Sequence, residues 1–292
     1  MENDERQDLI RRIRALSSPL SPRPTNAEPV LGPFSGIRAV LFDIYGTLVV
    51  SASGDIGLAG EQDEESAFRA ALAAAGLERP VGVGPHDLKA DIRAFHAERR
   101  AAGVEYPEVD ILTIWKSVLG SGENPERLAV EYECRVNPVW PMPGLAELLS
   151  AIRGRGLVLG IVSNAQFYTP LMLEAFLGAP LPELGFDPEC CAFSYRLLEA
   201  KPSTRIYREA LEGLERGHGI SSGEVLYVGN DVRNDIRPAA EVGCRTALFA
   251  GDARSLRLRK DDPTCTGVRP DRVIIELGQI VSHLLPGSER EA

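Results

Sequence analysis

Short apolar runs recur along the chain and alternate with stretches that carry apolar residues at helical spacing. Five runs are clear and a sixth is weaker: residues 37–43, 157–163, 190–194, 224–230, 244–250 and 272–277. Each has the length and apolar character of a buried strand. Because strands that alternate with helices form a mostly parallel sheet covered on both faces, we expect an α/β fold with a Rossmann-like parallel sheet core.

Residues 51–140 interrupt this alternation. They contain no comparable strand run, but they do contain three helical patterns, at residues 64–76, 85–103 and 108–120. Three prolines within residues 137–144 indicate a hinge where the chain returns. We therefore predict a core made of residues 36–50 and 141–285, with residues 51–140 forming a helical cap insert.

Both ends of the chain lie outside this pattern. Residues 1–35 begin with a short charged segment and continue with a stretch rich in proline and polar residues. Such composition is typical of mobile linkers, so we expect a flexible N-terminal extension. Residues 286–292 are expected to form a C-terminal tail.

Composition narrows the possible partners. The 292 residues carry a formal net charge of -10, which argues against a nucleic-acid partner because polyanions bind basic surfaces. No apolar stretch reaches the roughly 18 residues of a membrane-spanning helix, so no membrane partner is expected. The five cysteines show no C-x-x-C spacing, which favours reduced thiols and a cytoplasmic location. The oligomeric state stays open.

Polar residues cluster where the predicted strands end. They are Asp43 after the first strand, Ser163 and Asn164 after the second, Lys201 after the third, and Asp231 and Asp235 after the fourth. The carboxyl ends of parallel strands meet at one edge of a sheet, where ligands bind. We therefore expect carboxylates, one lysine, and hydroxyl and amide donors around a single crevice.

This combination suits covalent hydrolysis of a small-molecule anionic substrate. The carboxylate of Asp43 can act as a nucleophile, and carboxylates at two strand ends can hold Mg²⁺. The metal and Lys201 would offset the repulsion between substrate and nucleophile. The Ser163 hydroxyl and the Asn164 amide can donate hydrogen bonds to the transferring group.

Four segments, in this order and spacing, resemble the motifs of the haloacid dehalogenase superfamily: DIYGTL from residue 43, VSNA from 162, EAKPSTRIY from 199 and VGNDVRNDIRPAAEVG from 228. The resemblance implies that Asp43 is the nucleophile, Ser163 a phosphate-binding hydroxyl, and Lys201 the lysine of the third motif. It also implies metal-binding acids in the fourth motif. The insert stands where that superfamily carries a helical cap, between the first and second motifs.

Two positions depart from the phosphatases of that superfamily. Tyr45 stands where they usually carry an aspartate that protonates the leaving group. The D-x-Y-G-T form resembles the metal-independent 2-haloacid dehalogenases, whose fourth motif lacks the acidic pair found here as Asp231 and Asp235. Those acids are spaced by four residues instead of the common five, and Asn230 stands where one subgroup has aspartate.

Tyr45 is a poor general acid at neutral pH, because a phenol has a pKa of about 10. We therefore expect Tyr45 to close the pocket and to offer its backbone carbonyl to the metal. For Thr47 two roles stay open: it forms a hydrogen bond near the nucleophile, or it only stabilises the turn that follows the first strand. The predicted metal ligands are Asp43, Tyr45, Asp231 and Asp235.

We predict that the protein is a Mg²⁺-dependent hydrolase that acts on a small phosphorylated metabolite. The alternatives are a metal-independent dehalogenase and a non-catalytic module that binds a phosphorylated ligand or a partner. The missing aspartate implies either a leaving group that needs little protonation or an acid from the cap, where Asp55, Glu108 and Asp110 are candidates. Asp252 is a further candidate near the site, while the arginines of residues 249–260 are expected on the surface.

Overall fold

The computed structural model describes residues 3–53, 61–120 and 124–285. Its centre is a six-stranded sheet with the order β5-β4-β1-β6-β7-β8, in which every neighbouring pair is parallel. All six predicted runs form strands of this sheet, which are β1 (Ala39–Phe42), β4 (Val158–Ser163), β5 (Phe186–Phe193), β6 (Val225–Gly229), β7 (Arg245–Phe249) and β8 (Arg272–Ile274). The predicted α/β class with a parallel sheet is confirmed.

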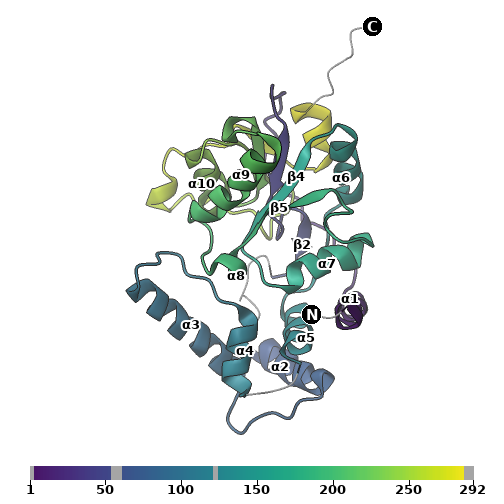
Figure 1. Ribbon diagram of the computed structural model, residues 1–292, viewed down its shortest axis with the longest axis vertical. Coiled ribbons are helices and arrows are strands. Elements are labelled where there is room, and N and C mark those ends of the chain that lie inside the picture. The colour runs from purple at the N-terminus through teal and green to yellow at the C-terminus, as the bar shows by residue number, and fades with distance from the viewer. Residues whose placement is uncertain (1–2, 54–60, 121–123, 286–292) are drawn as a thin grey trace.

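Helices cover both faces of the sheet, as Figure 1 shows. Side chains alternate between the two faces of a strand, so the residues of β1 pack in turn against the helices on each side of the sheet. Ala39 and Leu41 share one buried cluster with residues of α9 (Arg205–His218) and α10 (Arg237–Glu241). Val40 and Phe42 share another with residues of α6 (Leu145–Gly154) and α7 (Tyr168–Leu177). A short helix, α8 (Ser194–Leu197), follows β5.

The insert forms a separate helical lobe at one end of the molecule (Figure 1). Its described helices are α2 (Glu61–Ala75), α3 (Pro85–Ala101), α4 (Ile111–Leu119) and α5 (Pro125–Val136). The lobe has its own aromatic core, in which the Phe68, Trp115 and Tyr132 rings lie 5.4–6.2 Å apart. A two-stranded antiparallel ribbon of β2 (Val49–Ser51) and β3 (Val139–Pro141) joins it to the sheet.

The N-terminal segment differs from the flexible extension that the sequence predicted. Residues 3–16 form helix α1 (Asn3–Leu16), whose Leu9, Ile10 and Ile13 are buried. Three large aliphatic side chains removed from water stabilise a helix by roughly 1.5–3 kcal/mol each. The prediction was wrong here because the charged residues around this apolar stripe dominated the composition.

Helix α1 packs against both the core and the cap. Arg6 pairs with Glu174 of α7, and Arg12 pairs with Glu131 of α5, whose side chain is fully buried. Further along, Thr25 Oγ1 donates to the Ala250 carbonyl at 2.6 Å. The predicted C-terminal tail at residues 286–292 lies outside the described residues. In the part that the structure describes, no helix is long and apolar enough to cross a membrane.

Candidate active site

The predicted nucleophile follows β1 at the centre of the sheet. Asp43 is only 5% exposed, and its amide donates to the Val228 carbonyl of β6 at 2.9 Å. Its Oδ1 accepts from Ser163 Oγ at 3.1 Å and from Lys201 Nζ at 2.6 Å. No donor of a described residue reaches Oδ2. Because Asp43 lines a cavity of about 80 Å³, Oδ2 is the oxygen left for chemistry.

Lys201 connects two buried carboxylates. Its Nζ lies 2.6 Å from Asp43 Oδ1 and 2.6 Å from Asp235 Oδ1. Burial lowers the pKa of Lys201, but the Asp235 and Asp43 charges raise it by more, so the pKa lies above its ordinary value. The ammonium therefore stays charged and offsets the nucleophile's charge.

Asp235 anchors this lysine and the loop above it. Its Oδ1 accepts from Lys201 and from the Tyr227 hydroxyl at 2.9 Å, and its Oδ2 accepts from the amides of Asn230 and Asp231. Burial raises the pKa of Asp235 to about 6 against the opposing effect of Lys201. Both oxygens are engaged in a side chain that is 1% exposed. The prediction of Asp235 as a metal ligand is therefore corrected: it is a positioning residue.

Asp231 lines the cavity but is paired with an arginine. Its Oδ2 accepts from Arg259 Nη2 at 2.5 Å and from Asn234 Nδ2 at 3.1 Å. The loop that carries Arg259 folds back over the strand ends, where the Arg257 amide donates to the Asn230 carbonyl. The expectation that the arginines of this segment lie on the surface is wrong for Arg259, and Arg257 lines the cavity as well.

Asn164 holds the lysine backbone in place. Its Oδ1 accepts from the Lys201 amide at 2.7 Å, and its Nδ2 donates to the Lys201 carbonyl at 3.4 Å. These contacts use the amide oxygen and one of the two N–H groups of Nδ2, so one N–H is left for the hydrogen bond to the substrate that the sequence predicted. Asn164 therefore acts on the site by positioning Lys201.

The Tyr45 side chain turns toward α7. Its hydroxyl lies 2.9 Å from Thr169 Oγ1 and 3.7 Å from Met172 Sδ. Burial and the nearby Glu133 raise the pKa of Tyr45 well above its ordinary value, so the phenol stays protonated. Thr47 Oγ1 is buried and has no hydrogen-bond partner among the described residues, so no contact with the nucleophile supports a catalytic role for it.

Hard oxygen donors remain around the cavity. They are Asp43 Oδ2, the Tyr45 carbonyl and Asn230 Oδ1, and none of them accepts from a described residue. Asn230 Nδ2 donates to the Ser255 carbonyl at 2.7 Å, which fixes the orientation of that amide. Gly46, at φ +81°, allows this approach because a Cβ there would lie 2.3 Å from Asn230 Nδ2. One carboxylate with neutral oxygens fits the ligand preferences of Mg²⁺.

Sequence reasoning missed Ser255 and the arginine contacts. Ser255 lines the cavity, and its buried Oγ has no partner among the described residues. Nothing in the strand pattern indicates it, because it lies 25 residues beyond Asn230 in an irregular loop. A serine between two arginines at 254 and 257, after the fifth strand, was the available signal.

The structure gives different outcomes for the three cap residues that were candidates for the missing acid. Asp55 lies outside the described residues. Asp110 caps α4 by accepting from the Leu112 amide, which is a structural role. Glu108 is largely buried and lines a second cavity of about 380 Å³ between cap and core. That cavity adjoins the first, because Asn137 and Asn164 line both.

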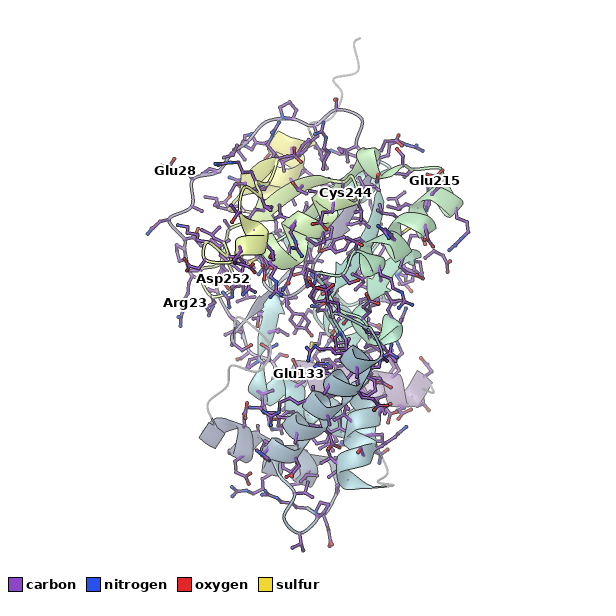
Figure 2. All side chains as sticks on the ribbon, turned by 90° about the vertical axis from the view of Figure 1, so that its left-hand side faces the viewer. Arg23, Glu28, Glu133, Glu215, Cys244 and Asp252 are labelled. Atoms are coloured by element: carbon purple, nitrogen blue, oxygen red, sulfur yellow. The ribbon has the colours of Figure 1, made fainter. Side chains whose placement is uncertain are left out.

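Asp252 does not reach the site. Its carboxylate accepts from the Arg23 amide at 2.9 Å and from Arg254, and it is not among the residues that line either cavity. Figure 2 places Asp252 beside Arg23 at the edge of the core lobe. The expectation for this residue is therefore wrong, and it serves to hold the N-terminal segment.

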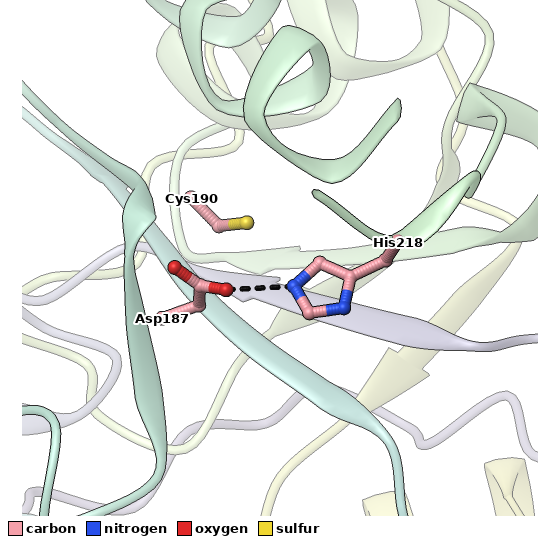
Figure 3. Close-up of side chains that lie close together, drawn as sticks. All are labelled: Asp187, Cys190 and His218. Atoms are coloured by element: carbon pink, nitrogen blue, oxygen red, sulfur yellow. Dashed lines mark hydrogen bonds and ion pairs between the residues drawn. The ribbon is translucent and has the colours of Figure 1, made fainter. Parts of the chain in front are cut away.

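A second group of metal-ligating side chains lies apart from the site. Asp187, Cys190 and His218 bring one potential ligand atom each within 4.8 Å of one another (Figure 3). Asp187 Oδ2 already lies 2.6 Å from His218 Nε2. Burial, with the nearby Asp187 and Glu189 charges, raises the pKa of the Cys190 thiol to about 12. The ion pair of Asp187 and His218 already engages two of the three potential ligands, and we assign no metal to the group.

Comparisons with known proteins find a family match over most of the chain. Residues 37–243 match the family model of haloacid dehalogenase-like hydrolases. Among solved structures, a 2-haloacid dehalogenase from Pseudomonas syringae pv. Tomato is 20% identical, with a TM-score of 0.53 over 84% of this chain and 96% of that one. An HAD phosphatase from Thermococcus onnurineus is 19% identical, with a TM-score of 0.49 over the same shares. No curated protein matches the sequence.

Proposed function

The chain belongs to the haloacid dehalogenase-like hydrolases, and we propose that it hydrolyses a small phosphorylated metabolite through a covalent intermediate on Asp43, with Mg²⁺ at the same site. One observation carries the proposal. Asp43 is buried and lines the cavity, and its carboxylate is fixed through Oδ1, while Oδ2 accepts no hydrogen bond from the described residues. A carboxylate held in this way is poised to attack an electrophile.

The proposed reaction has two steps. Asp43 Oδ2 attacks the phosphorus of a phosphate monoester, and the bond from phosphorus to the leaving oxygen breaks. That oxygen departs with the electron pair and takes up a proton from solvent. Water then attacks the phosphorus of the aspartyl phosphate, which releases inorganic phosphate and restores the carboxylate.

The surrounding residues hold the charges of this reaction. Lys201 and Ser163 restrain the nucleophile from one side. Asp235 keeps the lysine in place, and Asn164 keeps its backbone in place. Mg²⁺, held by Asp43, the Tyr45 carbonyl and Asn230, would neutralise charge on the phosphoryl oxygens.

A second candidate, hydrolysis of a small haloacid, is favoured by the charge balance of the site. Lys201 lies between Asp43 and Asp235, and Arg259 pairs with Asp231, so two cations offset most of the charge of these three carboxylates without a metal. Asp43 Oδ2 would then attack the carbon that bears the halogen, and halide would leave. Water would hydrolyse the resulting ester at the Asp43 carboxyl carbon.

A rate comparison separates these candidates. Alkyl and aryl phosphates and a 2-haloacid are offered to the protein with Mg²⁺ and with a chelator. We expect phosphate release that needs Mg²⁺ and is lost in Asp43→Asn. Halide release that persists in the chelator would favour the second candidate. A folded protein that turns over no member of the panel would favour a non-catalytic ligand-binding module.

A further inference from the structure

The second cavity has the size and position of a pocket for the organic half of a substrate. It has a volume of about 380 Å³, within the roughly 300–1,000 Å³ of ligand pockets. Cap helices α3, α4 and α5 line it together with the loop after β4. Because Asn137 and Asn164 also line the cavity of the nucleophile, a molecule bound at Asp43 can extend into it.

Two carboxylates of this pocket lack a cationic partner. Glu133 is buried and accepts from Asn137 Nδ2 at 3.1 Å and from the Tyr168 hydroxyl at 3.0 Å. Glu108 accepts from the Val109 amide at 2.9 Å. Neither occurs in an ion pair among the described residues, although buried charges in proteins are usually paired. Figure 2 shows Glu133 where the two lobes meet.

The two carboxyl groups are prepared to accept further hydrogen bonds. Each has about four lone-pair positions when ionised, and the contacts of Glu133 are with neutral donors. Glu108 likewise bonds the Ser194 hydroxyl at 2.8 Å. Burial raises the pKa of both groups, and a bound cation would favour their ionised forms.

The rest of the lining does not supply the missing charge. Lys89 is the one lysine or arginine among the residues that line the pocket, and its Nζ lies 2.6 Å from Glu64 Oε2. Burial lowers the pKa of His96, the other base of the lining, so Glu108 and Glu133 have no charged base beside them in the described lining. A second phosphate or carboxylate on the substrate would be repelled here, whereas a positive group would be attracted.

Aromatic side chains complete a surface suited to a cation. Trp115, Tyr132 and Tyr168 line the pocket, and aromatic faces attract ammonium groups. Trp115 is 1% exposed, and its Nε1 has no hydrogen-bond partner among the described residues.

We propose that this pocket binds a protonated amine, so that the substrate is a phosphate monoester whose organic group carries an ammonium near Glu133 and Glu108. The phosphate half of this substrate rests on the proposed phosphatase function at Asp43. The amine half rests only on the residues of the second cavity.

A matched pair of substrates tests it. Aminopropyl phosphate and n-butyl phosphate have nearly the same shape, but only the first carries an ammonium. A hydrogen bond to a charged group contributes about 1.5–3 kcal/mol, so kcat/KM should favour the amine by roughly 10–150-fold. Glu133→Gln and Glu108→Gln should each reduce this preference, because each should lower kcat/KM for the amine more than for the butyl ester. Glu65→Gln, on the cap surface and paired with Arg79, is the control.

Calorimetry with propylammonium alone keeps the two proposals separate. If neither ester is hydrolysed but propylammonium binds and Glu133→Gln abolishes its binding, the pocket assignment stands while the phosphatase function fails. Equal rates on the two esters in the native protein would overturn the inference. An equal loss on both esters in folded Glu133→Gln and Glu108→Gln variants would also overturn it, because that result indicates a structural role.

Discussion

Removing the ammonium of Lys201 should destabilise the protein strongly and in a pH-dependent way. In Lys201→Met, the buried Asp43 and Asp235 lose the cation that lies 2.6 Å from each. Breaking a buried ion pair by removing one partner costs about 3–5 kcal/mol. The total free energy of unfolding of a domain is about 5–15 kcal/mol. The substitution should therefore remove a large part of the stability of the protein near pH 8, where both carboxyl groups are ionised in the unfolded chain.

The pH dependence follows from Asp235. Its pKa in the folded protein is raised from 3.8 to about 6, so the folded state binds its proton more tightly than the unfolded state does. Stability from such a group is present below the unfolded pKa and is lost as pH rises through the folded pKa. Without Lys201 the folded pKa of Asp235 rises above this value, so the cost of the substitution should shrink as pH falls from 8 toward about 6 and level off at lower pH.

Urea unfolding of both proteins between pH 5 and pH 8 measures this effect. Arg216→Met is the control, because Arg216 and Glu189 form a pair with both side chains more than 60% exposed, and such pairs contribute about 0–1 kcal/mol. A cost for Lys201→Met that is no larger than the control, or that does not change with pH, would refute the argument that these charges depend on one another.

Three further predictions concern other contacts. Tyr45→Phe removes one hydrogen bond to Thr169, so it should cost about 0.5–1.5 kcal/mol in urea unfolding with little change in kcat; a loss of about 100-fold would mark the phenol as catalytic. Arg259→Gln should raise the Mg²⁺ affinity measured by calorimetry, because Asp231 loses its competing cation, and unchanged affinity would count against a metal near Asp231. Deleting residues 1–17 should speed hydrogen exchange in α5 and α7, which α1 covers, and unaltered exchange there would show that α1 is dispensable.

The sheet could be predicted because its strands are buried on both faces. A strand such as Leu159 to Val162 reads as an uninterrupted apolar run in the sequence. The polar residues that end these strands converge on one edge, so Asp43, Ser163 and Lys201 could be placed together. Helix α5 gave no clear pattern, because Glu131 and Glu133 are buried on different sides of it at positions where a buried helix usually has apolar residues.

The remaining site residues depend on tertiary contacts that no local pattern encodes. Arg259 belongs to a polar segment after β7, and only the fold-back of that loop brings it to Asp231. Asp235 could not be distinguished from a metal ligand, because its role follows from four simultaneous donors.

The covalent role of Asp43 is tested most directly by a single-turnover reaction in water enriched in heavy oxygen, quenched in acid at early and late times. We predict that the early peptide containing Asp43 carries the mass of a phosphoryl group. The late sample should then contain heavy oxygen in the released phosphate and none in the Asp43 carboxylate, because water attacks phosphorus. Labelled phosphate without any phosphorylated peptide would contradict the account, and heavy oxygen in Asp43 itself would show that the intermediate is a carbon ester.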